Sequence, residues 1–206
     1  LIINYKASLT VDASGSTTIH GIMMGGSLKV RGQLVVKNVI DGDGISVSGN
    51  GDFRVYKYGN VNIRDINGNG IWNNASVINM GYIFMEDTSN FGIYNYGSVN
   101  NDRGKLIILG DGNGGIVCNL GGQLLNSGKL SIKGGGLVLQ NDTYILNDTG
   151  GSIQISYADS YAIKINPGNN TFDNYGYLSA AYAIGLYGIY NEDTFINHES
   201  GSITID

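Results

Sequence analysis

The sequence predicts an all-β protein, a single-stranded, three-sided parallel β-helix (β-solenoid) with about 22–25 residues per coil, which we expect to be right-handed. Three observations predict this fold. Short runs of three to five residues alternate apolar and other side chains, as strands do. The runs recur at a nearly constant interval, and glycine or asparagine stands at the corners between them. We find no amphipathic helical pattern.

The first strand of each coil follows a marker glycine, after which one residue precedes two apolar positions spaced i, i+2. This marker occurs at Gly59, Gly81, Gly104, Gly128, Gly151, Gly176 and Gly201. Successive markers are 22, 23, 24, 23, 25 and 25 residues apart. A repeat of this length made of short strands is typical of a solenoid, in which each coil buries its apolar face against the next.

Two further strands complete each coil. The second begins about eleven residues after the marker, as in Gly70-Ile71-Trp72-Asn73 and Gly92-Ile93-Tyr94-Asn95. The third precedes the next marker, as in Val77-Ile78-Asn79. Because coils stack about 4.8 Å apart, equivalent residues should form columns. We therefore expect one interior column to contain Ile71, Ile93, Ile116 and Ile189.

Asparagine recurs at two of the corners, so we expect two ladders of stacked side-chain amides. The first ladder should contain Asn79, Asn126, Asn147, Asn174 and Asn197, with Asn101 as a further member. The second should contain Asn73, Asn95, Asn119, Asn166 and Asn191, with Gln140 at one rung. The alternative is that these residues serve only as turn formers.

We expect one domain over residues 1–206, because no linker or change of composition divides the chain. Residues 53–206 should form regular coils. Residues 1–52 should form irregular first coils, since Gly26 and Gly59 are 33 residues apart. That interval predicts an insertion near residues 39–51.

Composition argues against several classes of protein. Hydrophobic residues make up 42% of the chain and there is a single proline, so the 33 glycines do not indicate a disordered linker. The net charge is −5 and we expect no basic face, which argues against nucleic acid as a partner. No apolar run reaches the 18 residues that membrane insertion requires. The lone cysteine, Cys118, is expected to be a buried apolar side chain.

Outward aromatic residues are the main candidates for an interface or a glycan-binding site. Trp72, Tyr94 and Tyr190 should share an outward position on the second strand. A second group, expected at the corner before the marker glycine, comprises Tyr58, Tyr96 and Tyr175. Such rings can stack on one another, grip sugar rings or pack against another subunit, and we favour packing and an interface.

Acidic residues raise the alternative of an enzyme. Asp65, Asp87 and Asp111 are 22 and 24 residues apart and should therefore lie on one edge, either as solvated loop residues or flanking a sugar bond. Asp65, Asn67 and Asn69 match the first half of a calcium loop, but Ser76 stands where that loop needs a glutamate. We predict no catalytic residue, metal or cofactor.

The coils, with the form Gly-Ile-Tyr-Asn-x-Gly-x-Leu-x-Ile, resemble the passenger domains of secreted adhesins over roughly residues 50–206. The similar proteins are autotransporters, filamentous-haemagglutinin-type exoproteins and chlamydial polymorphic membrane proteins. Gly114-Gly115-Ile116 approximates the Gly-Gly-Ala-Ile element of the last group, and Phe172-Asp173-Asn174 is one residue short of its Phe-x-x-Asn element. The resemblance implies a right-handed β-helix at a cell surface that serves adhesion or display.

Together these features predict a non-enzymatic, extracellular structural β-solenoid. Its expected partner is a second copy of itself, stacked head to tail into a surface filament, sheath or layer. Two alternatives stay open. One is an adhesin module that binds glycans or host matrix through the tyrosine rows, and the other is a polysaccharide lyase or hydrolase.

Overall fold

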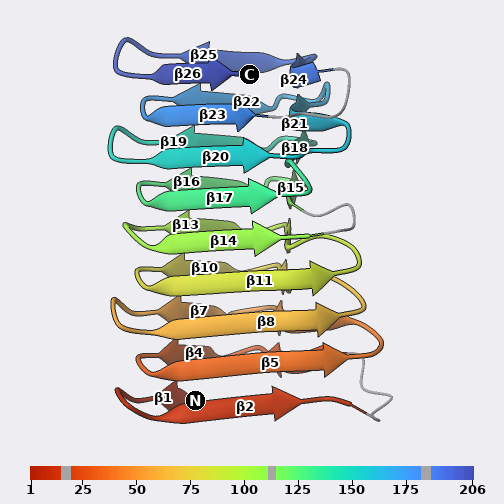
Figure 1. Cartoon of the computed structure of the whole chain (residues 1–206), viewed down its shortest axis with the longest axis vertical. Helices are drawn as coiled ribbons and strands as arrows, with labels where there is room; N and C mark the ends of the chain where they lie inside the picture. Colours follow the sequence, from red (N-terminus) through yellow and green to blue (C-terminus); the bar gives the residue numbers. More distant parts are fainter. Residues whose placement is uncertain (15–19, 111–114, 182–186) are drawn as a thin grey trace.

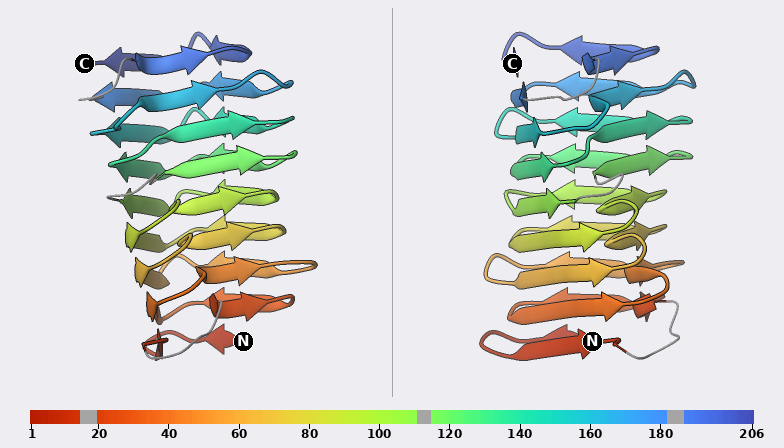
Figure 2. Two further views of the ribbon diagram at one scale, coloured as in Figure 1. Left: turned by 90° about the vertical axis from the view of Figure 1, so that its right-hand side faces the viewer. Right: turned by 45° about the vertical axis from the view of Figure 1, so that its right-hand side comes forward.

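The computed structural model describes residues 1–14, 20–110, 115–181 and 187–206. Its strands form three parallel sheets, in which each strand pairs with the equivalent strands of the coils before and after it. In Figure 1 the strands of the front wall point right and those of the rear wall point left, while the chain rises from the N-terminus at the bottom. This direction makes the coil right-handed. Figure 2 shows the same stack of coils from two further sides.

The three walls follow one another in the order sheet A, sheet B, sheet C along every coil. The nine strands of sheet A are β1 (Ile2–Ile3), β4 (Ser27–Val30), β7 (Asp52–Val55), β10 (Ser76–Asn79), β13 (Ser98–Asn101), β16 (Gln123–Asn126), β19 (Tyr144–Asn147), β22 (Thr171–Asn174) and β25 (Thr194–Asn197). The nine strands of sheet B are β2 (Ser8–Asp12), β5 (Gln33–Val39), β8 (Asn60–Ile66), β11 (Tyr82–Thr88), β14 (Lys105–Leu109), β17 (Lys129–Lys133), β20 (Ser152–Ser156), β23 (Tyr177–Ala181) and β26 (Ser202–Ile205). The eight strands of sheet C are β3 (His20–Met24), β6 (Asp43–Val47), β9 (Ile71–Asn73), β12 (Ile93–Asn95), β15 (Ile116–Asn119), β18 (Leu137–Gln140), β21 (Tyr161–Ile165) and β24 (Tyr187–Asn191).

The register of sheet B confirms the period that the marker glycines predict. Its successive inward partners are Val61, Ile83, Leu106, Leu130, Ile153, Leu178 and Ile203. In sheet A the interval varies more widely, from 21 residues between Asn126 and Asn147 to 27 between Asn147 and Asn174. The corners take up this variation, because the strands themselves stay in register.

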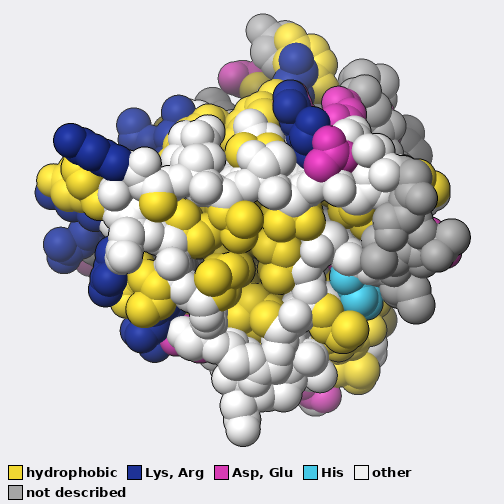
Figure 3. All heavy atoms as spheres, turned by 90° about the horizontal axis from the view of Figure 1, so that it is seen from below, with side chains coloured by type: hydrophobic (Ala, Val, Ile, Leu, Met, Phe, Trp, Pro, Cys, Tyr) yellow, Lys and Arg dark blue, Asp and Glu magenta, His cyan; other side chains and the backbone are white. Residues whose placement is uncertain are grey.

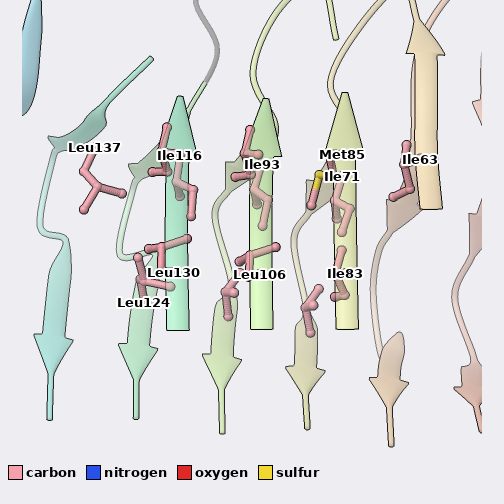
Figure 4. Packing of buried hydrophobic residues seen from close by; sticks show 14 of the residues in the cluster. Ile63, Ile71, Ile83, Met85, Ile93, Leu106, Ile116, Leu124, Leu130 and Leu137 are labelled. Carbon is pink, nitrogen blue, oxygen red and sulfur yellow. The ribbon is translucent and has the colours of Figure 1, made fainter. Parts of the chain in front are cut away.

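The interior is filled by columns of apolar side chains that alternate with outward residues along each strand. Sheet C pairs Ile71 with Ile93, Ile93 with Ile116, and Ile163 with Ile189, so the expected isoleucine column is confirmed. Leu137 and Ile163 occupy the two rungs between Ile116 and Ile189. Figure 4 shows the side chains of Ile71, Ile93, Ile116 and Leu137 following one another across successive strands.

The structure does not show the insertion that we expected near residues 39–51. Gly32, and not Gly26, stands at the marker position, because Gln33 and Leu34 pair with Asn60 and Val61. Asp43–Val47 forms β6, which pairs in parallel with β3 and β9. This segment is therefore the third wall of an ordinary coil.

The corners between sheet A and sheet B alternate in length along most of the stack. Long corners occupy residues 4–7, 56–59, 148–151 and 198–201. Short corners occupy residues 31–32, 80–81, 127–128 and 175–176. In Figure 1 the long corners protrude along the left edge and the short ones lie recessed between them. This edge, which we call the A–B edge, is therefore notched.

At the A–B edge the coils approach one another so closely that some positions accept only glycine. A Cβ atom on Gly128 would lie 2.3 Å from the carbonyl oxygen of Gly104 in the preceding coil. A Cβ atom on Gly150 would meet no atom closer than the carbonyl oxygen of Ser127, at 3.6 Å. The marker glycine at 128 is thus required by contact between coils.

The described residues include no helix with the length and apolar character that crossing a bilayer would need.

Candidate functional site

The first asparagine ladder is confirmed and runs through six coils of sheet A. Each side-chain amide nitrogen donates to the side-chain oxygen of the next asparagine, at 2.7–2.8 Å, from Asn79 through Asn101, Asn126, Asn147 and Asn174 to Asn197. The second amide proton is also used, as when Asn101 Nδ2 donates to the carbonyl oxygen of Lys129 at 3.1 Å. Asn79 to Asn174 are buried, so this is an interior structural ladder rather than a binding surface.

The second ladder is wrong beyond its first two members. Asn73 Nδ2 donates to Asn95 Oδ1 at 2.8 Å, but the register places Cys118 next to Asn95. The inward column then continues through Leu139 and Ile165 before it reaches Asn191.

Asn119 and Asn166 each stand one residue after the inward position of their coil, which Cys118 and Ile165 occupy. Because successive residues of a strand face opposite sides, the two asparagines lie outside the inward column. Asn119 instead donates to the Tyr94 hydroxyl at 3.2 Å, and Gln140 is its partner in the register. Asn166 lies at the corner, where its carbonyl oxygen accepts from Asn170 Nδ2.

Cys118 is fully buried, as expected, and burial raises the pKa of its thiol to about 12. The reactive species of a thiol is the thiolate, so this rise in pKa keeps Cys118 protonated and unreactive at neutral pH. We expect native protein at pH 8 to resist alkylation by iodoacetamide and to react at the normal rate in 8 M urea. Rapid labelling of the native protein, measured by mass spectrometry, would contradict the burial of this side chain.

Trp72 and Tyr94 are neighbours on the outward side of sheet C, as predicted. They form an aromatic cluster with Tyr96 and Phe91. The ring centroids are 5.9 Å apart for Trp72 and Tyr96, 5.1 Å for Tyr94 and Tyr96, and 5.6 Å for Phe91 and Tyr94. A hydrogen bond to Tyr94, together with burial, raises the pKa of the Tyr96 phenol. The rings are half-buried against one another, so packing accounts for much of their surface.

The remaining predicted tyrosines are distributed differently from the expectation. Tyr190 shares the outward column of Trp72 and Tyr94, but Val117, Val138 and Lys164 stand between them. Tyr96 lies at the corner between sheets C and A, because the strand that follows Gly97 is β13 of sheet A and not a strand of sheet B.

Tyr58 and Tyr175 do lie at the A–B edge. Tyr58 is 71% exposed and meets the Tyr5 ring edge-on, with centroids 6.1 Å apart. Tyr175 stacks on the His198 ring at 3.7 Å.

Asp65 and Asp87 occupy equivalent positions of β8 and β11, between the pairs Arg64–Glu86 and Ile66–Thr88. Both have left-handed backbone, with φ of 55° and 52°, and both carboxylates are exposed at the corner between sheets B and C. They line a shallow hollow of about 560 Å³ together with Asn38 and Asn67. Asp111, the third predicted carboxylate, lies outside the described residues.

The amides expected to help hold calcium are used between coils. Asn67 Nδ2 donates to the carbonyl oxygen of Ile40 at 2.8 Å, and Asn69 Nδ2 donates to Asp43 Oδ1 at 2.7 Å. The Oδ1 atom of Asn69 accepts from the Phe91 amide. Among the described residues, no three His, Cys, Asp or Glu side chains lie close enough together to hold a metal ion.

One polar cluster was not predicted. On the outer side of sheet A, Asp173 accepts from the Tyr144 hydroxyl at 3.0 Å with one oxygen, and its other oxygen lies 3.0 Å from His198 Nε2. Burial, followed by the contact with Asp173, raises the pKa of Tyr144 to about 12. The residues are 25 and 29 positions from Asp173, one coil away in each direction. The pairing of neighbouring coils brings the three side chains together across corners of different length. Their spacing in the sequence alone does not indicate the contact.

The expectation of no basic face is also wrong for one part of the surface. Seen from the N-terminal end, a group of Lys and Arg side chains gathers on the side of the A–B edge (Figure 3). These residues belong to different coils and are far apart in the sequence, so no run of basic residues predicts the cluster.

The searches against protein-family models, curated proteins and solved structures found no match to this chain. What the observations establish is therefore the fold, a right-handed parallel β-solenoid built from sequence repeats.

Proposed function

We propose that this chain is a non-enzymatic structural β-solenoid that works outside the cell and is extended, coil upon coil, by head-to-tail stacking with copies of itself. The observation that carries the proposal is that the interior side chains of a coil are fully buried only when another coil covers them on each side. Leu34, Val36 and Ile45 are 0% exposed, whereas the equivalent Leu9, Val11 and Ile22 of the first coil are only partly buried. At the opposite end Ile205 is 53% exposed.

The two end faces are suited to each other. The open edges of sheets A and B are β1 and β2 at one end and β25 and β26 at the other, so a stacked copy can continue the pairing of these two walls. Sheet C ends one strand earlier, at β24, and would lack one strand at the joint. The end that carries the N-terminus has apolar side chains at its centre and polar ones round them (Figure 3). A contact between unlike faces does not close on itself and therefore produces a rod.

Two expectations remain part of the proposal. Few charged residues and abundant glycine, asparagine and tyrosine support an extracellular location, and the adhesin-like coil pattern supports display at a surface. The non-enzymatic part of the proposal is supported by the exposure of Asp65 and Asp87 to solvent at a corner.

The test uses the 206-residue protein at rising concentration, examined by negative-stain electron microscopy and light scattering. We expect rods of constant width whose length grows with concentration. Leu9→Lys places a charge on the apolar end face and should stop growth, whereas Thr10→Lys, on the outward side of the same strand, should not. Ile205→Lys repeats the test at the other end.

Dispersed monomers at high concentration, or equal growth of the Leu9→Lys and Thr10→Lys proteins, would contradict stacking. Circular dichroism of each variant serves as the check that it keeps its strands. The same samples are incubated with plant and bacterial polysaccharides. Release of reducing ends or unsaturated sugars that disappears in the Asp65→Asn/Asp87→Asn protein would replace the structural proposal with an enzyme.

A further inference from the structure

Five cations line the A–B edge and the neighbouring margin of sheet B, and we call this surface the basic strip. Its members are Lys6, Arg31, Lys57, Lys105 and Lys129. Arg103 and the carboxylates of Asp102, Asp148 and Glu199 lie at other corners of the same edge. All five are exposed, and none makes a salt bridge with a described carboxylate. Lys37, also on sheet B, differs because it pairs with Asp12 at 2.9 Å and thereby lowers the pKa of that carboxyl. In a chain of net charge −5, this strip is a local concentration of positive charge without carboxylate partners.

The lower part of the basic strip is a hollow of about 370 Å³ above the recessed corner at Arg31 and Gly32. The protruding long corners on either side supply two exposed rings, Tyr5 and Tyr58. Ser8, Gln33 and Asn60, the first residues of three neighbouring strands, form its polar side. No acidic residue lines this hollow.

The upper part is a second hollow of about 340 Å³, lined by Lys105 and Lys129 together with Ser131, Ser152 and Gln154. Lys105 and Lys129 are direct partners in the register of β14 and β17. Like charges that face each other across neighbouring strands destabilise a sheet, so this pair has a cost that no carboxylate offsets. Tyr82 is the next residue of the same column and has Lys105 Nζ 5.6 Å from its ring centroid.

From this arrangement we infer that the basic strip binds an acidic polysaccharide, a chain of uronic acid units laid parallel to the solenoid axis. Lysine and arginine would pair with the carboxylates of the sugar. Serine, asparagine and glutamine side chains would bond its hydroxyl groups, and tyrosine rings would pack against its C–H faces. Each hollow has a cation, hydrogen-bonding side chains and a tyrosine ring, either among its lining residues or, as with Tyr82, on the neighbouring strand.

The repeat of the protein suits a linear polymer of sugars. Neighbouring strands are about 4.8 Å apart, which is close to the length of one pyranose unit in an extended chain. Equivalent positions of the column, from Ser8 through Gln33, Asn60, Tyr82, Lys105 and Lys129 to Ser152, therefore offer one contact per sugar. The strip lies on a side wall, so it stays accessible whether or not the end faces are stacked.

Nucleic acid suits the strip less well. Double-stranded DNA carries a charge about every 1.7 Å along its axis and needs a broad basic surface. Here five cations are spread over several coils among neutral amides and hydroxyls, and the molecule as a whole is acidic. A polymer with one charge per sugar unit matches the spacing of these cations better than duplex DNA does.

The test is isothermal titration of the 206-residue protein with sodium polygalacturonate at low salt. We expect binding that weakens with salt and falls about tenfold in Lys105→Gln/Lys129→Gln. Arg31→Gln and Tyr58→Ala should each weaken it severalfold. The matched control, Lys29→Gln/Lys164→Gln, removes the same charge from the outward sides of sheets A and C and should change affinity less than twofold.

Three results would overturn the inference. The first is no binding of polygalacturonate, and the second is equal loss in the control and strip variants. The third is equal binding of duplex DNA or phosphatidylglycerol vesicles at matched charge, because that would show a general attraction for polyanions. Loss of binding when the polymer is methyl-esterified would support the role of its carboxylates. Failure here leaves the end-to-end growth of the same protein unaffected, so the two proposals are judged separately.

Discussion

Replacing Asn101 by alanine is expected to lower the free energy of unfolding by about 3–5 kcal/mol, while the same change at Asn100 should lower it by less than about 1 kcal/mol. The two residues are adjacent on β13, but Asn101 is fully buried and Asn100 lies on the outward side. The comparison therefore isolates the contribution of the interior ladder.

The large effect at Asn101 has two sources. Its loss removes the acceptor of Asn79 Nδ2 and the donor to Asn126 Oδ1, and each unpaired buried group costs about 1–3 kcal/mol. The smaller side chain also leaves a cavity between tightly stacked coils. Urea unfolding followed by circular dichroism measures both variants, with equal m values as the check on comparability. Equal loss in the two variants would contradict a stabilising ladder.

Gly128→Ala is expected to destabilise the protein by about 3 kcal/mol, at the upper end of what overpacking costs. The added methyl group would lie 2.3 Å from the Gly104 carbonyl oxygen and 2.8 Å from the Gly104 nitrogen. These are backbone atoms that hold the coil spacing, so no side-chain rotation relieves the clash. The coils themselves would have to separate at the A–B edge.

Gly150→Ala is the control for this change, since its nearest neighbour would be at 3.6 Å and its φ is not left-handed. We expect it to be neutral or slightly stabilising, because alanine reduces the freedom of the unfolded chain. Thermal and urea unfolding of both variants give the comparison. A stable Gly128→Ala protein would show that neighbouring coils are less tightly coupled than the structure indicates.

The strands and the first ladder could be predicted because both follow from counting along a strand. In each coil of that ladder the asparagine stands two residues after an inward apolar residue, as Asn79 does after Val77 and Asn174 after Phe172. Two residues is the period of a strand, so both side chains face inward. Asn119 and Asn166 break this count, since each stands three residues after its inward isoleucine.

The basic strip and the Tyr144–Asp173–His198 cluster could not be predicted in the same way. Their members come from corners or outward positions of different coils, where chain length varies and no apolar pattern fixes the register. The hollows depend in addition on which corners are long and which are short. Sequence periodicity determines the walls of this protein, but the shape of its edges requires the structure.

The amides of the first ladder all point the same way. From Asn79 to Asn174 every side chain presents its NH₂ group to the coil nearer the C-terminus, and from Asn101 to Asn197 every side-chain oxygen accepts from the coil nearer the N-terminus. Both terminal groups are satisfied within the chain, because Asn79 Oδ1 accepts from Gly81 and Asn197 Nδ2 donates to Gly201. The aligned amide dipoles therefore add, as they do along an α-helix, and give the molecule an internal electrical polarity. Two such molecules lying side by side lower their dipolar energy when they run in opposite directions.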